Sequence, residues 1–355
     1  MKKRKLFTGF IALFLLIGSL YILQRLLMPK YMSGIVEGSL VGEYYKEDVK
    51  KHDVIFIGDC EVYENFSPIT LWEKYGITSY IRGSAQQLIW QSYYLLEETL
   101  KYEKPKVVVF NVLSMKYDQP QKEAYNHMTL DGMEMSLSKL KSIKASMLKD
   151  ENIMDYLFPL LRYHSRWDKL QKEDFQYLFN KEKLFNNGYY MRVDVKPAGS
   201  IPKARKLPDY QFGKNSYDYL DRMVKLCEEN GIKLVLIKAP TLYPNWYDEW
   251  DNQMVNYAKK NNLTYINFLK STKEIGLDYN VDTYDGGLHL NVSGAEKLSN
   301  YFGNFLTKTY QLKDHRNDKN LKKVWEKKID FYYAMKKDQQ KELAEYGYLK
   351  RYAIK

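Results

Sequence analysis

Short apolar runs alternate with helical stretches in two separated blocks of this chain, and that alternation limits the folds it can adopt. The first block carries strand-like runs at His52–Ile57, Ile77–Ile81 and "PKVVVFNVL", and the second carries "KLVLIKAP" and "LTYINFL". Helical stretches with short links separate these runs, which predicts an α/β fold with a parallel sheet and helices on both faces. Ser67, Ser84 and Ser293 are placed to cap three of the helices.

The composition divides the chain into four segments. Residues 1–28 hold a basic end and an apolar run, 29–52 a polar connector, 53–312 the α/β domain and 313–355 a basic tail. Residues 115–212 lose the strand–helix rhythm, and we interpret them as an insertion over the active edge of the sheet. A chain of 355 residues is long enough for this arrangement.

The amino-terminal run predicts a membrane anchor. From Leu6 to Gln24 there are 19 consecutive uncharged, mostly apolar residues, and four cations precede them. A helix of this length spans the hydrocarbon core of a bilayer. The preceding cations place the amino terminus in the cytoplasm and the rest of the chain outside. A cleaved signal peptide is the alternative, but the run is longer than a usual signal core and no small-x-small cleavage pattern follows it.

The net charge of +11 is concentrated at the two ends of the chain. Lys2, Lys3, Arg4 and Lys5 supply part of it, and residues 313–355 hold 13 Lys and Arg against 7 Asp and Glu. The body between them is nearly neutral, which gives nucleic-acid binding little support.

The basic tail reads as an amphipathic helix with an apolar stripe of Val324, Trp325, Ile329, Tyr332 and Tyr333. We expect this stripe to pack on the tail's own domain. Contact with anionic lipid headgroups or an anionic cell-wall polymer is the alternative.

The chain has two cysteines, in different settings. Cys60 directly follows a strand that closes in Gly58-Asp59, and strand ends of this kind are where α/β proteins place nucleophiles. A small buried hydrophobe is the competing interpretation of Cys60. Cys227 falls on the apolar face of a helix and is expected in the core. A Cys60–Cys227 disulfide stays open, because the sequence does not give the geometry.

A second candidate for chemistry lies in "YDGGLHLN", just before the last helix of the domain. Two glycines separate Asp285 from Leu288 and His289. They let the chain fold tightly enough for the carboxylate to reach the imidazole and fix its tautomer. An ordinary turn capped by Asp285 is the alternative.

The other histidines suggest no second site. His52 and His315 are expected to be solvated. His127 and His164 fall in the predicted insertion, and their spacing assigns them no role. No cluster with metal-ligand spacing is visible, so we predict neither a metal nor a cofactor.

Together, these two sites resemble the blocks of the SGNH, or GDSL, hydrolase family over about residues 53–113 and 214–310. Gly58-Asp59-Cys60 resembles the Gly-Asp-Ser block with cysteine in the serine position, and Asp285 and His289 resemble the closing Asp-x-x-His block with one residue more between them. The resemblance implies a flavodoxin-like three-layer fold. It makes Gly83 the second-block glycine of the oxyanion hole and Asn111 the third-block asparagine, without the Gly-x-Asn-Asp context.

The anchor and "HLNVSGAEKL" are similar to membrane-anchored cell-envelope members of that family, of the DltD-like type. This resemblance implies extracytoplasmic acyl transfer or ester hydrolysis on a cell-envelope glycopolymer, such as a teichoic acid or exopolysaccharide. Cys60 would be the nucleophile, His289 the base and Asp285 its orienting residue. The alternative is a non-catalytic accessory protein that binds polymer or partners a polytopic membrane O-acyltransferase.

Overall fold

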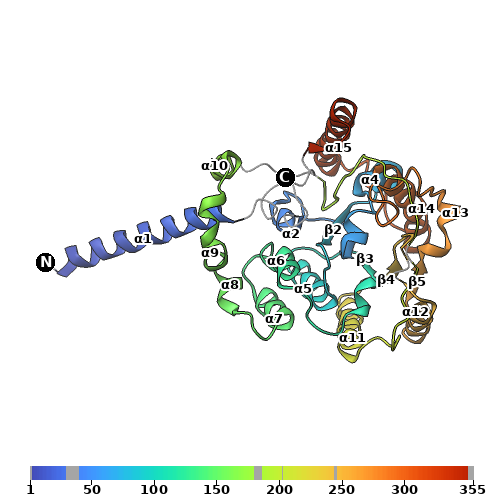
Figure 1. The fold of residues 1–355 in the computed structure, drawn as a ribbon, viewed down its shortest axis with the longest axis horizontal. Helices are drawn as coiled ribbons and strands as arrows, with labels where there is room; N and C mark the ends of the chain where they lie inside the picture. The colour runs from blue at the N-terminus through green and yellow to red at the C-terminus, as the bar shows by residue number, and fades with distance from the viewer. Residues whose placement is uncertain (1, 29–39, 180–185, 202, 244–245, 351–355) are drawn as a thin grey trace.

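The computed structural model describes residues 2–28, 40–179, 186–201, 203–243 and 246–350, and Figure 1 shows their arrangement. Five parallel strands form one sheet in the order β2-β1-β3-β4-β5. The strands are β1 (Val54–Gly58), β2 (Ser79–Gly83), β3 (Val107–Asn111), β4 (Lys233–Lys238) and β5 (Thr264–Asn267). This is the flavodoxin-like strand order, and the predicted α/β parallel sheet is confirmed.

Helices cover both faces of the sheet (Figure 1). On one face lie α4 (Pro68–Tyr75), α13 (Thr272–Ile275), α14 (Val292–Tyr310) and α15 (Lys319–Tyr346). On the other lie α5 (Ile89–Thr99), α11 (Lys214–Glu229) and α12 (Asp248–Lys260). The strands β1 and β3 are buried throughout because both of their faces are packed, which explains their unbroken Val/Ile/Phe runs.

The two cysteines belong to opposite faces of this sheet. Cys60 packs against the core shared with α4 and α14, whereas Cys227 is buried in the core shared with α5 and α11. Both are free thiols. The sheet separates them, so the disulfide that the sequence left open does not form in this fold.

Local signals predicted one of the three serine caps correctly. Ser67 accepts a hydrogen bond from the backbone N–H of Thr70, and Gly76 ends the helix with a φ of +66°. The Ser84 cap is wrong, because Gln86 has a φ of +49° and α5 begins only at Ile89. The Ser293 cap is wrong by two residues: the side chain of Asn291 accepts from the backbone N–H groups that open α14.

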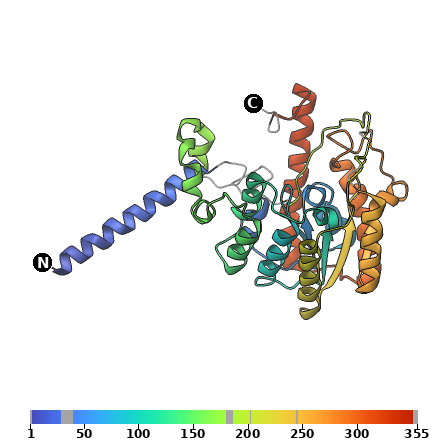
Figure 2. The same ribbon diagram turned by 60° about the horizontal axis from the view of Figure 1, so that its bottom comes forward.

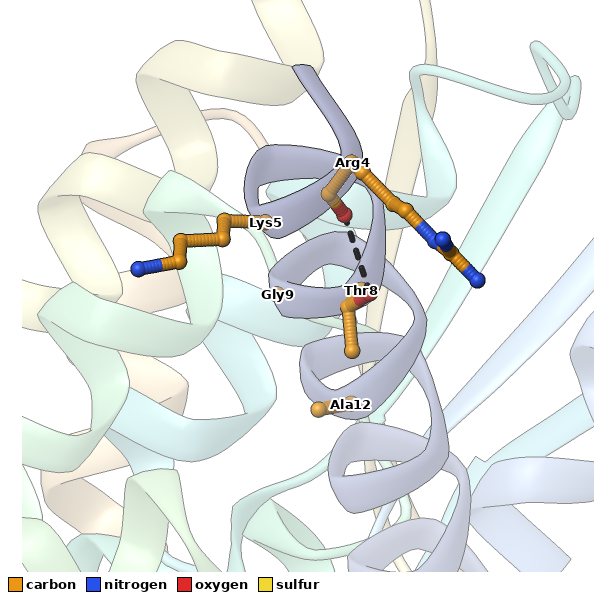
Figure 3. A pocket seen from close by; sticks show the side chains of 5 residues that line it. All are labelled: Arg4, Lys5, Thr8, Gly9 and Ala12. Carbon is orange, nitrogen blue, oxygen red and sulfur yellow. Dashed lines mark hydrogen bonds between the residues drawn. The ribbon is translucent and has the colours of Figure 1, made fainter. Parts of the chain in front are cut away.

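The predicted anchor is a continuous helix, α1 (Lys2–Leu27). Among the described residues, Lys3–Leu27 is the one stretch long and apolar enough to cross a membrane, and its apolar window is not buried by the protein. Figure 3 shows its basic end, where Arg4 and Lys5 extend from the helix and the Thr8 hydroxyl turns back onto the Arg4 carbonyl oxygen at 2.9 Å. A hydroxyl satisfied within its own helix suits apolar surroundings.

The segment interpreted as an insertion is largely helical. It carries α6 (Glu123–Leu130), α7 (Leu137–Ser146), α8 (Ile153–Leu157), α9 (Pro159–Tyr163), the 3₁₀ turn η5 (His164–Lys169) and α10 (Lys172–Phe179). Most of these helices lie away from the carboxyl edge of the sheet: α7 packs on α5, and α9 and α10 contact α1. Two parts of the segment reach that edge. The Thr129 hydroxyl of α6 bonds that of Ser84 just after β2, and the backbone carbonyl oxygen of Arg192 accepts from the backbone N–H of Val292.

Several one-turn helices complete the described chain. They are α2 (Leu40–Glu43), η3 (Tyr44–Lys46), α3 (Cys60–Tyr63), η4 (Val112–Lys116) and η6 (Phe268–Lys270). Residues 29–39 of the predicted connector and residues 351–355 of the predicted tail lie outside the described residues.

The tail packs on its own domain, as expected. The Trp325 ring stacks on that of Trp72 with centroids 4.9 Å apart, and Tyr332 is buried. Buried Lys328 pairs with Glu47 at 2.6 Å. Tyr333 is the exception within the predicted stripe, because half of its side chain stays exposed.

The tail also holds the chain at Asn187 against β2, an edge strand of the sheet. The backbone N–H of Ile81 donates to the carbonyl oxygen of Asn187 at 2.9 Å, and the Asn187 amide returns a bond to Ser79. Lys328 of α15 donates to the side-chain oxygen of Asn187. The edge strand is therefore paired with the chain near residue 187 rather than open.

Two histidines expected in solvent are buried instead. His52 hydrogen-bonds Glu103 through Nδ1 at 3.0 Å, and His315 reaches Asp53 through Nε2 at 2.7 Å. Each carboxylate comes from a distant part of the chain, so the sequence carried no local signal for either pair.

Candidate functional site

The local backbone presents Cys60 at the carboxyl edge of the sheet. Gly58 ends β1 with a φ of +156°, and a Cβ there would approach Val62 to 2.6 Å and Asn111 to 3.1 Å, so only glycine fits. Asp59 then caps α3 by accepting from the backbone N–H of Glu61. Cys60 is the first residue of α3, a position whose backbone N–H has no partner within the helix. Its side chain is only partly buried.

The loop before α14 brings Asp285 and His289 together. Gly286 and Gly287 have φ values of +84° and +105°, which turn the chain tightly. One Asp285 oxygen accepts from the backbone N–H groups of Leu288 and His289, and the other lies 2.7 Å from Nδ1 of His289. The predicted contact between Asp285 and His289 is thus present, and Asp285 holds both the loop and the ring.

The His289 ring also reaches the thiol. One ring nitrogen of His289, the Cys60 sulfur and a Glu64 oxygen lie within 4.8 Å of one another. Glu64 lies 3.5 Å from Nδ1. The three residues that the sequence singled out therefore lie together: Asp285 is bonded to His289, and Cys60 lies beside the ring with Glu64 next to it.

Burial and neighbouring charges have opposite effects on the pKa values of Cys60 and His289. Burial raises the pKa of the Cys60 thiol to about 12, although His289 opposes the shift. Burial alone lowers the pKa of His289, but Glu64, Cys60 and Asp285 outweigh it and hold that pKa well above its ordinary value. His289 therefore stays protonated to a higher pH than a free imidazole does, and the Cys60 thiol stays protonated to a higher pH than a free thiol does.

The two residues suggested for the oxyanion hole lie in different surroundings. Gly83 ends β2 directly beside Gly58, and a Cβ there would lie 3.0 Å from the Gly58 carbonyl oxygen. Asn111 ends β3 beside the turn that follows β1, where its Nδ2 donates to Asp59 and Glu61, each at 3.0 Å. Both amide hydrogens of Asn111 are thus used, and we assign it to holding the loop rather than to an oxyanion.

Asn111 belongs to a buried charged network that the sequence did not reveal. Lys238, at the end of β4, donates to both Glu61 oxygens at 2.9 and 2.7 Å, and both side chains are nearly inaccessible. Burial, together with Glu61, raises the pKa of Asp59 to about 6. This network holds the turn after β1 through Asp59 and Glu61, which are bonded to Asn111 at the end of β3 and Lys238 at the end of β4.

Sequence reasoning also missed the surroundings of Glu64. The Tyr284 hydroxyl donates to Glu64, and Arg192 lies over the Tyr284 ring, 4.2 Å from its centroid. Two signals were available: Glu64 follows Cys60 by one helical turn, and Tyr284 immediately precedes Asp285. Arg192 comes from the extended end of the insertion and offered no local signal.

Cys60, Glu64 and His289 offer one ligand atom each, all within 4.8 Å of one another. Thiolate, carboxylate and imidazole are zinc ligands, and a catalytic zinc uses three protein ligands. Here Nδ1 of His289 is bonded to Asp285 and Glu64 accepts from Tyr284, so both of these groups already have hydrogen-bond partners. The arrangement fits a hydrogen-bonded relay better than a metal centre, and the absence of a metal or cofactor stays a prediction.

Comparison with known proteins finds similarity to solved structures. No protein-family model matches the chain, and no curated protein does. A crystal structure of a proposed acylhydrolase from Bacteroides fragilis is similar, with 14% sequence identity and a TM-score of 0.35. The similarity covers 74% of this chain and 89% of that one.

Thiol alkylation tests the electrostatics of the site. We expect iodoacetamide to label Cys60 much faster than Cys227, because Cys60 is partly exposed and lies beside His289, whereas Cys227 is buried in the core. Labelling of Cys60 should speed up as the pH rises through the raised pKa of His289. In Glu64→Gln the loss of one negative charge lowers that pKa, so the curve should move to lower pH. Liquid chromatography with mass spectrometry measures both rates.

Cys227 serves as the internal control, because its labelling should not respond to Glu64→Gln. Equally slow labelling of both cysteines would instead support an inert Cys60. An unchanged or upward-shifted curve in Glu64→Gln would contradict the role given to Glu64.

Proposed function

We propose that this chain is a membrane-anchored enzyme of acyl transfer or ester hydrolysis, with Cys60 as nucleophile, His289 as base and Asp285 as the residue that orients it. The observation that carries the proposal is the position of the His289 ring, whose Nδ1 lies 2.7 Å from Asp285 and which has a ring nitrogen within 4.8 Å of the Cys60 sulfur. Nucleophile, base and orienting group in that order form the arrangement of covalent acyl chemistry.

The proposed reaction has two steps. Nε2 of His289 takes the thiol proton as sulfur attacks the ester carbonyl, and a carbon–sulfur bond forms. The backbone N–H groups of Cys60 and Gly83 face the oxyanion in this proposal. The carbon–oxygen bond then breaks, and His289 returns its proton to the departing alcohol. In the second step a hydroxyl attacks the thioester, His289 takes its proton, and the thiolate that leaves is protonated again.

The acceptor we propose is a hydroxyl of a cell-envelope glycopolymer outside the cytoplasm. The cations in the first turn of α1, ahead of its apolar part, favour a cytoplasmic amino terminus and an extracytoplasmic domain. A thioester favours transfer to a well-placed nucleophile, and a tethered site meets polymeric acceptors at high effective concentration. A polytopic membrane O-acyltransferase is the proposed partner that would supply acyl groups.

A trapped intermediate tests the proposal. We expect a small activated ester, p-nitrophenyl acetate, to leave an acetyl group on Cys60 that neutral hydroxylamine removes, as seen by intact mass and peptide mapping. Cys227→Ser should acylate normally, because Cys227 lies across the sheet. His289→Ala should acylate far more slowly. Acylation confined to surface lysines, with Cys60 unmodified, would overturn the nucleophile assignment.

A further inference from the structure

The helices at the end of the anchor expose an unusual number of large apolar side chains. Over α8, α9, η5 and α10, residues 153–179, the Trp167 side chain is 71% exposed and that of Phe179 90%. Three more residues of this segment, Phe158, Leu161 and Phe175, have about half of their side chains exposed. Exposed apolar patches of this kind mark interaction surfaces.

The segment is fixed to the carboxyl end of α1. Arg166 donates to the carbonyl oxygens of Leu27 and Met28, both at 3.0 Å, and pairs with Asp174 at 2.9 Å. Asp174 and Leu27 are buried by this contact. An arginine on the last carbonyls of a helix satisfies groups that have no partner within it.

The position of the segment follows from that clamp. Figure 1 shows α10, α9 and α8 set across the end of α1, and Figure 2 shows the same group standing at that end, apart from the sheet. The apolar part of α1 before Gln24 is exposed along its length, as a span surrounded by lipid would be. Once α1 crosses a bilayer, the segment clamped at residues 27 and 28 lies at the membrane surface.

The chemistry of the segment suits the lipid interface. Tryptophan and phenylalanine favour the boundary between headgroups and acyl chains. Acidic and basic residues are nearly balanced from Lys149 to Phe179. Attraction would therefore come from apolar insertion and not from anionic headgroups.

We propose that α8, η5, α9 and α10 form a membrane foot, which inserts Trp167, Phe179 and their apolar neighbours into the leaflet that α1 leaves. The foot would fix the orientation of the α/β domain relative to the membrane. With the anchor alone, the domain could rotate about its single attachment. This inference rests on α1 as a membrane span and is independent of the chemistry proposed for Cys60.

Tryptophan quenching in nanodiscs tests the foot. The full chain is placed in phosphatidylcholine nanodiscs whose lipids carry bromine near the glycerol end of the acyl chain, which quenches nearby indole emission. The anchor contains no tryptophan, and Trp72, Trp90, Trp250 and Trp325 are buried in the domain. Trp246 is half-buried and packs against Phe212 and Trp250 in the domain, so its emission is measured in Trp167→Phe. We expect bromine to remove the emission contributed by Trp167 and to remove none in Trp167→Phe.

A second variant keeps the reporter and weakens the insertion. Phe175→Ser/Phe179→Ser changes two exposed side chains, so the fold should persist while quenching of Trp167 decreases. Unquenched emission from a chain that co-migrates with the nanodiscs would overturn the foot and assign the patch to a protein partner. Quenching that survives in Trp167→Phe would overturn it too. A chain that does not enter nanodiscs would overturn both the anchor and the foot, without bearing on Cys60.

Discussion

Cells that carry Cys60→Ala or His289→Ala should lose acylation of the envelope polymer, with a rate decrease on the order of 10⁶, the loss known for nucleophile–base triads. In the proposed mechanism, His289 acts only through the thiol beside it, and His289 is the base that activates that thiol. Groups that act as one unit fail together, so the double variant should be no worse than either single one. Acyl content of purified polymer from each strain is the measurement.

Cys60→Ser separates transfer from hydrolysis. A serine would give an oxygen ester, whose breakdown by water is ordinary, so this variant should keep some esterase activity on small activated esters and lose transfer to the polymer. Cys227→Ser is the matched control and should behave as wild type, since it lies in the core across the sheet. Wild-type acylation in Cys60→Ala cells would exclude the catalytic role and favour the non-catalytic accessory protein.

Lys238→Met should lower the free energy of unfolding by about 3–5 kcal/mol, because it leaves the Glu61 carboxylate buried without its charged partner. Only Asn111 would still donate to Glu61. A loss of this size is a large part of the total stability of a typical domain. Urea unfolding of the full chain in detergent, followed by circular dichroism, gives the change in midpoint and slope.

Two variants make the Lys238 result specific. Lys238→Met/Glu61→Gln removes both charges and should recover most of the loss, because replacing a whole buried pair is often close to neutral. Lys214→Met removes a lysine whose pair with Asp218 is exposed, and should cost less than about 1 kcal/mol. A loss in Lys238→Met as small as that of Lys214→Met would contradict the structural role of the network.

The parts of the fold that were predictable from sequence are those fixed by neighbouring residues. The Val/Ile/Phe runs gave the strands to within a few residues, and Ser67 with Gly76 gave both ends of α4. Ser84 misled, because the capping signal did not show that Gln86 would turn into the left-handed region. Interactions between residues close in sequence determine where a strand or a helix begins, and a single residue with a positive φ can shift that start by several residues.

The candidate site divides in the same way. Asp285 and His289 could be paired from sequence because two glycines allow only a short closed loop between them. Lys238 could not be placed beneath Glu61, nor Arg192 over Tyr284, because each contact joins strands or loops far apart in the chain. His52 and His315 were misjudged for the same reason, since each carboxylate partner lies more than 50 residues away.

The cover over β2 has a consequence for how copies of this chain behave at high density in a membrane. An open edge strand is a template on which another chain can add its own strand, and anchored chains that share one surface meet often. Here the backbone near Asn187 already takes up hydrogen bonds of that edge, and α15 holds it in place through Lys328. The carboxyl-terminal helix thus helps to keep the β2 edge, one of the two edges of the sheet, closed to strand addition by a neighbouring copy.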